Sequence, residues 1–194
     1  VTFTEIIKGI LGAGGLVCSE IAAHSGILRR AKDGGQRVRR FATGESTQRS
    51  RLDADSLTAK LRSRAVEQLS QADTDVWLIL DGSDLRKPYA HQMPDLMKVR
   101  SLEGRLVPGY RTLTVLGVTP GRRGILYQRL FSSQEQEFES EPAEVQKALQ
   151  TVGYSLAGVK SRHAVTWILD RGFDDQAVWR TIWEQGEHLV CRLL

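Results

Sequence analysis

The sequence has 194 residues, enough to bury the core of one domain, or of a small domain joined to a larger one. Hydrophobic residues make up 41% and charged residues 26% of it, and no apolar run approaches the roughly 20 residues that span a membrane. The first residues contain neither an initiator methionine nor the pattern of a secretory signal, so we expect the sequence to begin inside a longer protein.

The net charge of +4 hides an uneven distribution. Residues 1–70 carry 12 Lys and Arg against 7 Asp and Glu, whereas residues 71–194 carry 15 against 16. A basic excess confined to the first third suggests a polyanionic partner for that region. Cys18 and Cys191 match neither a metal site nor a disulfide framework, and we interpret them as buried thiols in a reducing cytoplasm.

Two short helices are predicted at the start of the sequence. Apolar residues at helical spacing indicate a helix over 4–11, which a glycine-rich segment ends, and a second helix over 16–24, which ends at Ser25-Gly26. A helix, a turn with glycine and a helix are compatible with a small helix-turn-helix, although any helical hairpin gives the same pattern.

A basic segment follows. Residues 28–64 contain 11 basic and 4 acidic residues, with no Trp or Tyr between them. We therefore expect contacts with the backbone of a nucleic-acid duplex rather than stacking on single-stranded bases; a solvated face is the alternative. The helix predicted over 57–70 has an apolar stripe and should pack against the main domain.

The period then changes from helical to extended. Apolar runs predict strands over 76–80, 112–118, 124–131, 164–169 and 188–194, and helices over 143–152 and 174–184. The first strand reads as a central strand covered on both faces. The order β-β-β-α-β-α-β predicts an α/β fold with a mixed sheet flanked by helices, preceded by a small helical N-terminal region. We divide the sequence into a basic helical region, 1–72, and a sheet domain, 73–194.

Two of the apolar strands end in an aspartate, Asp81 and Asp170. Carboxylates at the carboxyl ends of buried strands lie at the rim of a sheet, where α/β folds place ligands and metals. If the two strands are neighbours, both carboxylates can share a metal, as in two-metal phosphoryl-transfer enzymes.

Other interpretations of these acids stay open. Asp81-Gly82 is a common turn pair, and the role of Asp84 is undecided. A haloacid phosphatase would need its second aspartate two residues after the first, not three, and the sequence has no Gly-Lys-Ser/Thr phosphate loop and no nucleophile elbow. We interpret Asp174 and Asp175 as caps of the helix that follows them.

Three segments together resemble a known family. Asp81-Gly82-Ser83-Asp84-Leu85-Arg86-Lys87-Pro88-Tyr89-Ala90, Pro108-Gly109-Tyr110 and Trp167-Ile168-Leu169-Asp170-Arg171-Gly172-Phe173-Asp174 look like the DDE transposases of bacterial insertion sequences, in the group typified by insertion sequence four. Arg39-Arg40-Phe41 also resembles the N-terminal region of that group.

The resemblance implies a ribonuclease-H-like fold in which Asp81 and Asp170 are catalytic residues that bind Mg²⁺ or Mn²⁺. It implies metal-dependent cleavage of transposon ends and strand transfer without a covalent enzyme intermediate, on double-stranded DNA and with a homodimer formed on that DNA. The bacterial cytoplasm, at the nucleoid, is the implied location. The residues assigned to DNA binding are Arg29, Arg30, Arg37, Arg39, Arg40, Lys87 and Arg171.

The third acid of the family, a glutamate in a Tyr-Arg-Glu-Lys context, has no counterpart here, so we expect this piece alone to be inactive. Glu184 and Glu187 are interpreted as surface residues, and Trp77 and Trp167 as core residues. The alternatives are a non-catalytic protein that binds transposon ends, from a truncated element, and a ribonuclease-H-like nuclease unrelated to transposition.

Overall fold

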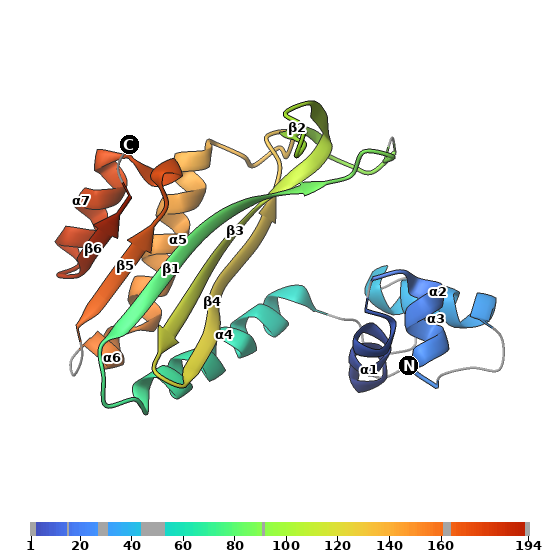
Figure 1. The fold of residues 1–194 in the computed structure, drawn as a ribbon, viewed down its shortest axis with the longest axis horizontal. Coiled ribbons are helices and arrows are strands. Elements are labelled where there is room, and N and C mark those ends of the chain that lie inside the picture. The colour runs from blue at the N-terminus through green and yellow to red at the C-terminus, as the bar shows by residue number, and fades with distance from the viewer. Residues whose placement is uncertain are drawn as a thin grey trace. The chain divides into compact units, whose positions relative to one another are not determined.

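The computed structural model describes residues 3–14, 16–26, 31–43, 53–90, 92–160 and 164–192 (Figure 1). The chain divides into two compact units, Val1–Leu57 and Thr58–Leu194, and each is considered by itself.

In the first unit the described residues form three helices, α1 (Phe3–Ala13), α2 (Cys18–His24) and α3 (Ala31–Thr43). Their shared core consists of Ile6, Ile21, Ala22 and Val38. Gly9 lets α1 approach α2 closely, because a Cβ atom at this position would collide with the backbone of Ile21. The two predicted helices correspond to α1 and α2, whereas α3 lies in the part of the basic segment where no helix was predicted.

Within the described residues, no single helix is long and apolar enough to cross a membrane. Only the α1–α2 pair, which is bent by 102°, meets that length and composition when its two helices are added together.

In the second unit the described residues form one sheet of six strands. They are β1 (Val76–Arg86), β2 (Met97–Arg100), β3 (Leu106–Thr119), β4 (Arg122–Phe131), β5 (Val165–Leu169) and β6 (His188–Cys191). The strand order is β2-β3-β1-β5-β6, and β4 also pairs with β3. The first four strands pair antiparallel, while β1–β5 and β5–β6 pair parallel. This is the mixed sheet flanked by helices that the sequence predicted.

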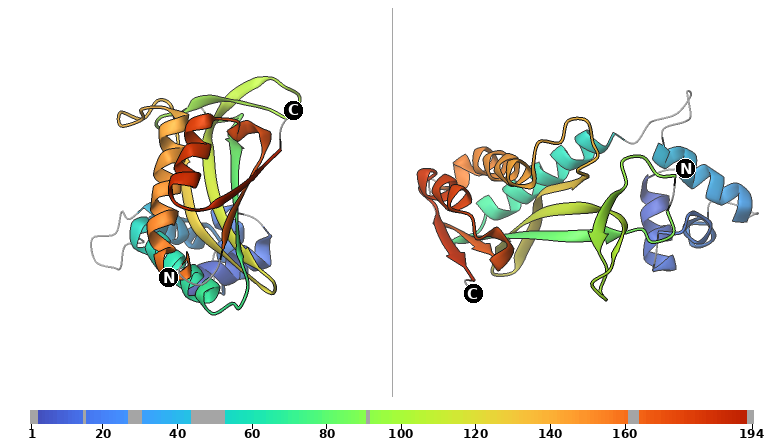
Figure 2. Two further views of the ribbon diagram at one scale, coloured as in Figure 1. Left: turned by 90° about the vertical axis from the view of Figure 1, so that its left-hand side faces the viewer. Right: turned by 90° about the horizontal axis from the view of Figure 1, so that it is seen from above.

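Helices cover one face of this sheet (Figure 2). They are α4 (Ala54–Ser70), α5 (Glu141–Ser155), α6 (Ala157–Lys160) and α7 (Gln176–Glu184). Leu78 and Leu80 of β1 point into the core beneath them, together with Leu149 of α5 and Ile182 of α7. Ser140 caps α5 by accepting a hydrogen bond from the backbone of Ala143. The predicted packing of the helix before β1 against the sheet is correct, since Ala65 and Leu69 of α4 belong to this core.

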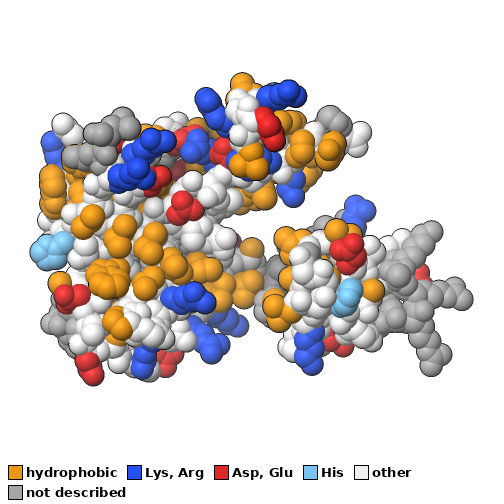
Figure 3. Space-filling model, viewed as in Figure 1, with side chains coloured by type: hydrophobic (Ala, Val, Ile, Leu, Met, Phe, Trp, Pro, Cys, Tyr) orange, Lys and Arg blue, Asp and Glu red, His pale blue; other side chains and the backbone are white. Residues whose placement is uncertain are grey.

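The opposite face of the sheet, which we call the open face, is uncovered in the described part of the chain. The prediction that β1 is covered on both faces is wrong, and so is the core assignment of Trp77: Trp77 and Ile79 are 46% and 36% exposed. A row of paired apolar residues crosses five strands on this face: Val190, Ile168, Ile79, Leu116 and Ile125. Figure 3 is viewed from this side and shows apolar side chains across it.

Three strands are longer than predicted, and one was not predicted. β4 begins at Arg122, two residues before its predicted start. β1 continues to Arg86 and β3 begins at Leu106, because the two strands stay paired as far as Arg86 and Gly109. β2 pairs with the first residues of β3 inside a segment that we had interpreted as a loop. Its four residues, only two of them apolar, give no strand signal that stands out from the surrounding prolines.

The contact between α4 and β4 predicts a sharp effect on stability. A Cβ atom at Gly124 would lie 2.5 Å from the Cβ atom of Ala65, which sits on the rigid backbone of α4. We expect Gly124→Ala to lower the free energy of unfolding by about 1 to 3 kcal/mol, as overpacking does elsewhere. Gly158→Ala, where the added Cβ meets nothing within 4 Å, is the matched control and should not destabilise the protein. Denaturant unfolding measures both, and equal stabilities would contradict the packing described.

Candidate active site

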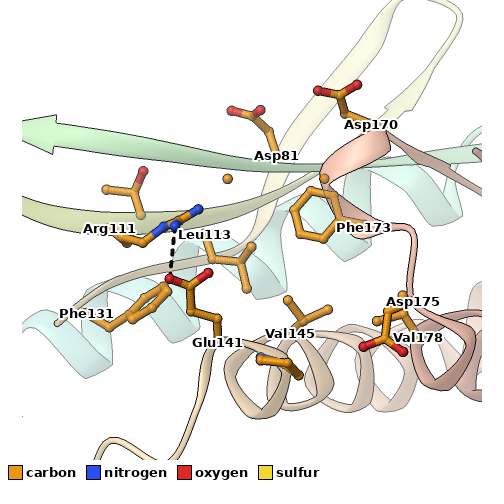
Figure 4. Close-up of a pocket in the computed structure, with 14 residues that line it drawn as sticks. Asp81, Arg111, Leu113, Phe131, Glu141, Val145, Asp170, Phe173, Asp175 and Val178 are labelled. Carbon is orange, nitrogen blue, oxygen red and sulfur yellow. Dashed lines mark hydrogen bonds and ion pairs between the residues drawn. The ribbon is translucent and has the colours of Figure 1, made fainter. Parts of the chain in front are cut away.

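Two aspartates lie side by side where the pairing of two neighbouring parallel strands, β1 and β5, ends. Leu80 of β1 pairs with Leu169 of β5, so Asp81 and Asp170 occupy the next position of each chain segment. Neighbouring strands are about 4.8 Å apart. Both carboxylates are exposed, and they point to the same side of the sheet (Figure 4). The two residues singled out in the sequence therefore come together, although 89 residues separate them.

The position of Asp81 differs from the prediction in one respect. It lies inside β1 and not at its end, because β1 continues beside β3 after β5 has ended. Successive side chains of a strand point to opposite faces, so Asp81 shares the open face with Trp77 and Ile79. The acid pair thus faces away from the helices.

Short hydrogen bonds orient the two carboxylates. Ser83 Oγ donates to Asp81 Oδ2 at 2.9 Å. The backbone N–H of Arg171 donates to Asp170 Oδ1 at 2.7 Å, so Asp170 caps the short 3₁₀ helix η1 (Arg171–Phe173). In each carboxylate, one oxygen accepts a hydrogen bond from the protein while the group stays at the surface.

Asp84 belongs to a different environment. It lies three residues after Asp81 on the same strand and therefore on the opposite face. Its carboxylate accepts a hydrogen bond from the backbone of Arg100 at 3.1 Å and lies 3.6 Å from the Arg111 guanidinium. The role of Asp84, which the sequence left undecided, is thus structural: its carboxylate connects β1 to β2 and β3.

Only one of the two predicted helix caps is present. Asp175 Oδ1 accepts a hydrogen bond from the backbone of Ala177 at 2.7 Å and caps α7. Asp174 is not the cap of this helix, so that interpretation is wrong. The capping assignment had to choose between adjacent acids, and the pattern of residues does not distinguish them.

A pocket of about 200 Å³ lies beside the acid pair (Figure 4). Both aspartates are among its lining residues, and the rest of its wall comes from the helix-covered side and includes Leu113, Phe173 and Val145 of α5. Figure 4 shows the two carboxylates pointing away from this wall. At its rim, Arg111 Nη1 donates to Glu141 Oε1 at 2.9 Å. Sequence reasoning missed Arg111 and Glu141, because residues 30 positions apart show no periodic relation before the sheet and α5 are assembled.

Glu187 is a second residue that the sequence misplaced. It was interpreted as a surface residue but is 5% exposed, and its carboxylate accepts a hydrogen bond from Trp167 Nε1 at 2.5 Å. Trp167 itself is fully buried, as predicted. The bond links the segment before β6 to β5, the strand that ends one residue before Asp170. Glu184 is exposed, as predicted.

The residues assigned to DNA binding are spread over both units. Arg37, Arg39 and Arg40 are exposed on α3, and Arg171 is exposed beside Asp170. Lys87 is half-buried, and its backbone N–H donates to Pro108 O at 2.7 Å. Arg29 and Arg30 lie outside the described residues.

The acid pair creates a negative region around the carboxyl end of β5. Burial raises the pKa of the Cys191 thiol, and the nearby carboxylates of Asp174 and Asp170 raise it further. Cys18 and Cys191 are both unpaired thiols, and neither is fully buried. A negative surface of this kind attracts cations.

The acid pair fits a hard divalent cation. Carboxylate oxygens are the ligands of Mg²⁺, which keeps several waters and is commonly bound by one or two carboxylates together with substrate phosphates. In the part of the chain that the structure describes, no group of three His, Cys, Asp or Glu residues comes close enough to hold a metal ion. Asp81 and Asp170 are the residues that would hold such a cation at this edge of the sheet.

No family model matches the chain, and no curated protein matches it. Among solved structures, the chain is similar to the Mos1 strand transfer complex, with a TM-score of 0.34, 14% identity, and coverage of 97% of this chain and 57% of that chain. It is also similar to the Mos1 transposase paired-end complex with left transposon end, with a TM-score of 0.37, 14% identity, and coverage of 97% of this chain and 58% of that chain. A third similar structure is the Mos1 mariner paired end complex with Mn, with a TM-score of 0.36, 13% identity, and coverage of 97% of this chain and 58% of that chain.

The chain thus spans 57 to 58% of the length of these Mos1 chains. At these TM-scores and identities, the likeness establishes neither a family nor an activity.

The different environments of Asp81 and Asp84 predict opposite effects on stability. Asp84→Asn weakens an ion pair and a charge-assisted hydrogen bond, so the free energy of unfolding should fall by about 1 kcal/mol. Asp81→Asn removes one of two neighbouring negative charges, so stability without divalent metal should stay the same or rise by less than about 1 kcal/mol. Denaturant unfolding in a chelating buffer compares the two. A larger loss for Asp81→Asn would show that Asp81 is a structural residue.

Proposed function

We propose that the chain carries the catalytic core of a metal-dependent DNA transposase of the DDE type, which cleaves transposon ends and transfers them to target DNA. Because the third acid of that family has no counterpart in this sequence, the proposal includes that this piece alone is inactive. The observation that carries this proposal is the position of Asp81 and Asp170, which directly follow the last paired residues of β1 and β5 and point to the same side of the sheet (Figure 4). The resemblance of both surrounding segments to the insertion-sequence-four group supports it. Mg²⁺ or Mn²⁺ is the proposed cofactor.

In this proposal Asp81 and Asp170 hold divalent cations against a DNA phosphate. The bound metal supplies Lewis-acid chemistry to the phosphoryl group and to the attacking hydroxyl. The Ser83 hydroxyl orients the Asp81 carboxylate, and the backbone N–H of Arg171 orients the Asp170 carboxylate. The exposed Arg171 side chain is adjacent and carries the charge needed to contact a flanking phosphate.

Duplex DNA is the proposed partner, with the first unit as a second contact surface. Arg37, Arg39 and Arg40 lie on α3, whose Val38 anchors the helix in the core of that unit. Arginines on an anchored helix suit contacts with duplex phosphates. Assembly as a homodimer on paired transposon ends, and a place at the nucleoid in a bacterial cytoplasm, are part of the same proposal.

Metal binding tests the acid pair directly. We expect Asp81→Asn and Asp170→Asn each to weaken binding of Mn²⁺ at least about tenfold, because even residues that only support metal ligands change affinity by 10- to 100-fold. Titration calorimetry with Mn²⁺ measures this. Asp84→Asn is the matched control, since it removes the same charge from the same strand on the opposite face and should leave binding unchanged.

Three outcomes would overturn the catalytic proposal. Wild-type protein that binds no Mn²⁺ would favour a DNA-binding protein without catalysis. Equal affinities in all variants would place the metal elsewhere. Cleavage of a duplex without any joining of ends would instead indicate a ribonuclease-H-like nuclease.

DNA binding by the first unit has its own test. We expect Arg37→Gln/Arg40→Gln to weaken binding of duplex DNA in 100 mM salt and to lower the slope of log affinity against log salt by about 1.8, which is 0.9 for each lost phosphate contact. Fluorescence anisotropy with a labelled duplex measures the slope. Gln36→Ala, a neutral change at an exposed position of the same helix, should leave it unchanged.

A further inference from the structure

One end of the sheet extends beyond its helical cover as an arm. We define the arm as residues 84–110: the outer part of β1, the short strand β2, the connecting segments and the start of β3. Figure 1 shows β2 and its neighbours at the end of the sheet away from α7. The proposed function uses only Lys87 from this segment.

The arm is held together by specific contacts. Val99 is 3% exposed and packs on Gly109, where any Cβ atom would collide with it. Tyr110 Oη donates to Pro94 O at 2.5 Å and fastens the segment that precedes β2. Around Arg100, the backbone N–H donates to Asp84 and the carbonyl accepts from Arg86 Nε at 2.8 Å. These contacts hold β2 and the segment before it against β1 and β3.

The arm carries more positive than negative charge. Its cations are Arg86, Lys87, Lys98, Arg100 and Arg105, and its acids are Asp84, Asp95 and Glu103. Asp84 is engaged with Arg111, as described above. Lys98 and the Arg100 side chain are exposed and make no ion pair within the described residues. Figure 3 shows Lys and Arg side chains around this end of the sheet.

The pairing register places two of these cations on the face of the acid pair. Alternate residues of β3 share a face, and on that face Thr114 pairs with Asp81, Pro108 with Lys98, and Leu106 with Arg100. Lys98 and Arg100 therefore lie on the open face, in line with Asp81. The helix-covered face continues instead through Arg86 and Arg111, whose contacts stay within the protein.

The residue spacing along β3 gives the distances from Asp81 to Lys98 and Arg100. At about 3.3 Å per residue, Lys98 lies about 20 Å and Arg100 about 26 Å from the level of Asp81. A duplex rises about 3.4 Å per base pair, so these distances correspond to about six to eight base pairs.

We propose that Lys98 and Arg100 bind the phosphate backbone of duplex DNA six to eight base pairs from a phosphate held at Asp81 and Asp170. The inference rests on the proposed function and adds a DNA contact surface to it. Charge complementarity favours this occupant: the acid pair requires metal to accept a phosphate, whereas the two cations accept flanking phosphates directly. An acidic protein segment would gain nothing from the alignment with the acid pair.

The test compares two double variants of the full chain. Lys98→Gln/Arg100→Gln should lower the slope of log affinity against log salt by about 1.8 for a labelled 30-base-pair duplex, at 0.9 per lost phosphate contact. Lys60→Gln/Arg180→Gln removes two exposed charges from α4 and α7 and should leave the slope unchanged. Lys98→Arg/Arg100→Lys, which keeps both charges, should restore the wild-type slope. Anisotropy in a chelating buffer keeps the acid pair free of metal.

Each result decides the proposal. An unchanged slope in the Lys98→Gln/Arg100→Gln variant overturns it, as does an equal loss in the Lys60→Gln/Arg180→Gln control. An equal loss of affinity for a polyglutamate peptide also overturns it, in favour of an acidic protein partner. The Mn²⁺ titration separates this inference from the proposed function: the arm variant should bind Mn²⁺ like the wild type, and failure of the Asp81 and Asp170 variants to lose metal overturns only the proposed function.

Discussion

The parallel pairing of β1 with β5 is the constraint on which the candidate site depends. It sets Leu80 beside Leu169, and the two aspartates follow from that register. The pairing is supported from below by the core under α5 and α7 and by the bond between Trp167 and Glu187. Because the side-chain period of a strand is two, a slip of one residue would turn Asp81 toward the core. Packing and chemistry are thus set by the same register.

Much of the sheet could be predicted because its strands are local apolar runs. Such a run does not say how many faces are covered, however, and Trp77 shows the consequence: an apolar residue in a strand-forming run lies on the open face. β2 could not be found, since it is defined by pairing with β3 rather than by its own four residues. Strand extensions such as Gly82–Arg86 depend on the partner strand in the same way.

The residues of the candidate site also divide into those that the sequence could predict and those that it could not. Asp81 and Asp170 follow strong strand signals, so their adjacency could be anticipated. Arg111 and Glu141 meet only after α5 packs beside the sheet, and Glu187 is buried only because Trp167 offers it a donor. Asp84 resembles Asp81 in sequence and differs in the structure, because three steps along a strand reverse the face. Features set by the pattern within one segment could be predicted, whereas contacts between segments distant in the sequence could not.

The separation of 89 residues between the two aspartates also has a kinetic consequence. The antiparallel strands β1, β3 and β4 join segments close in sequence, whereas the pairing of β1 with β5 closes a much longer loop. Contacts between distant segments cost more chain entropy and tend to form late in folding. A partly folded chain can hold the antiparallel strands without holding the acid pair. Occupancy of that pair by a divalent ion would therefore report that the chain has finished folding.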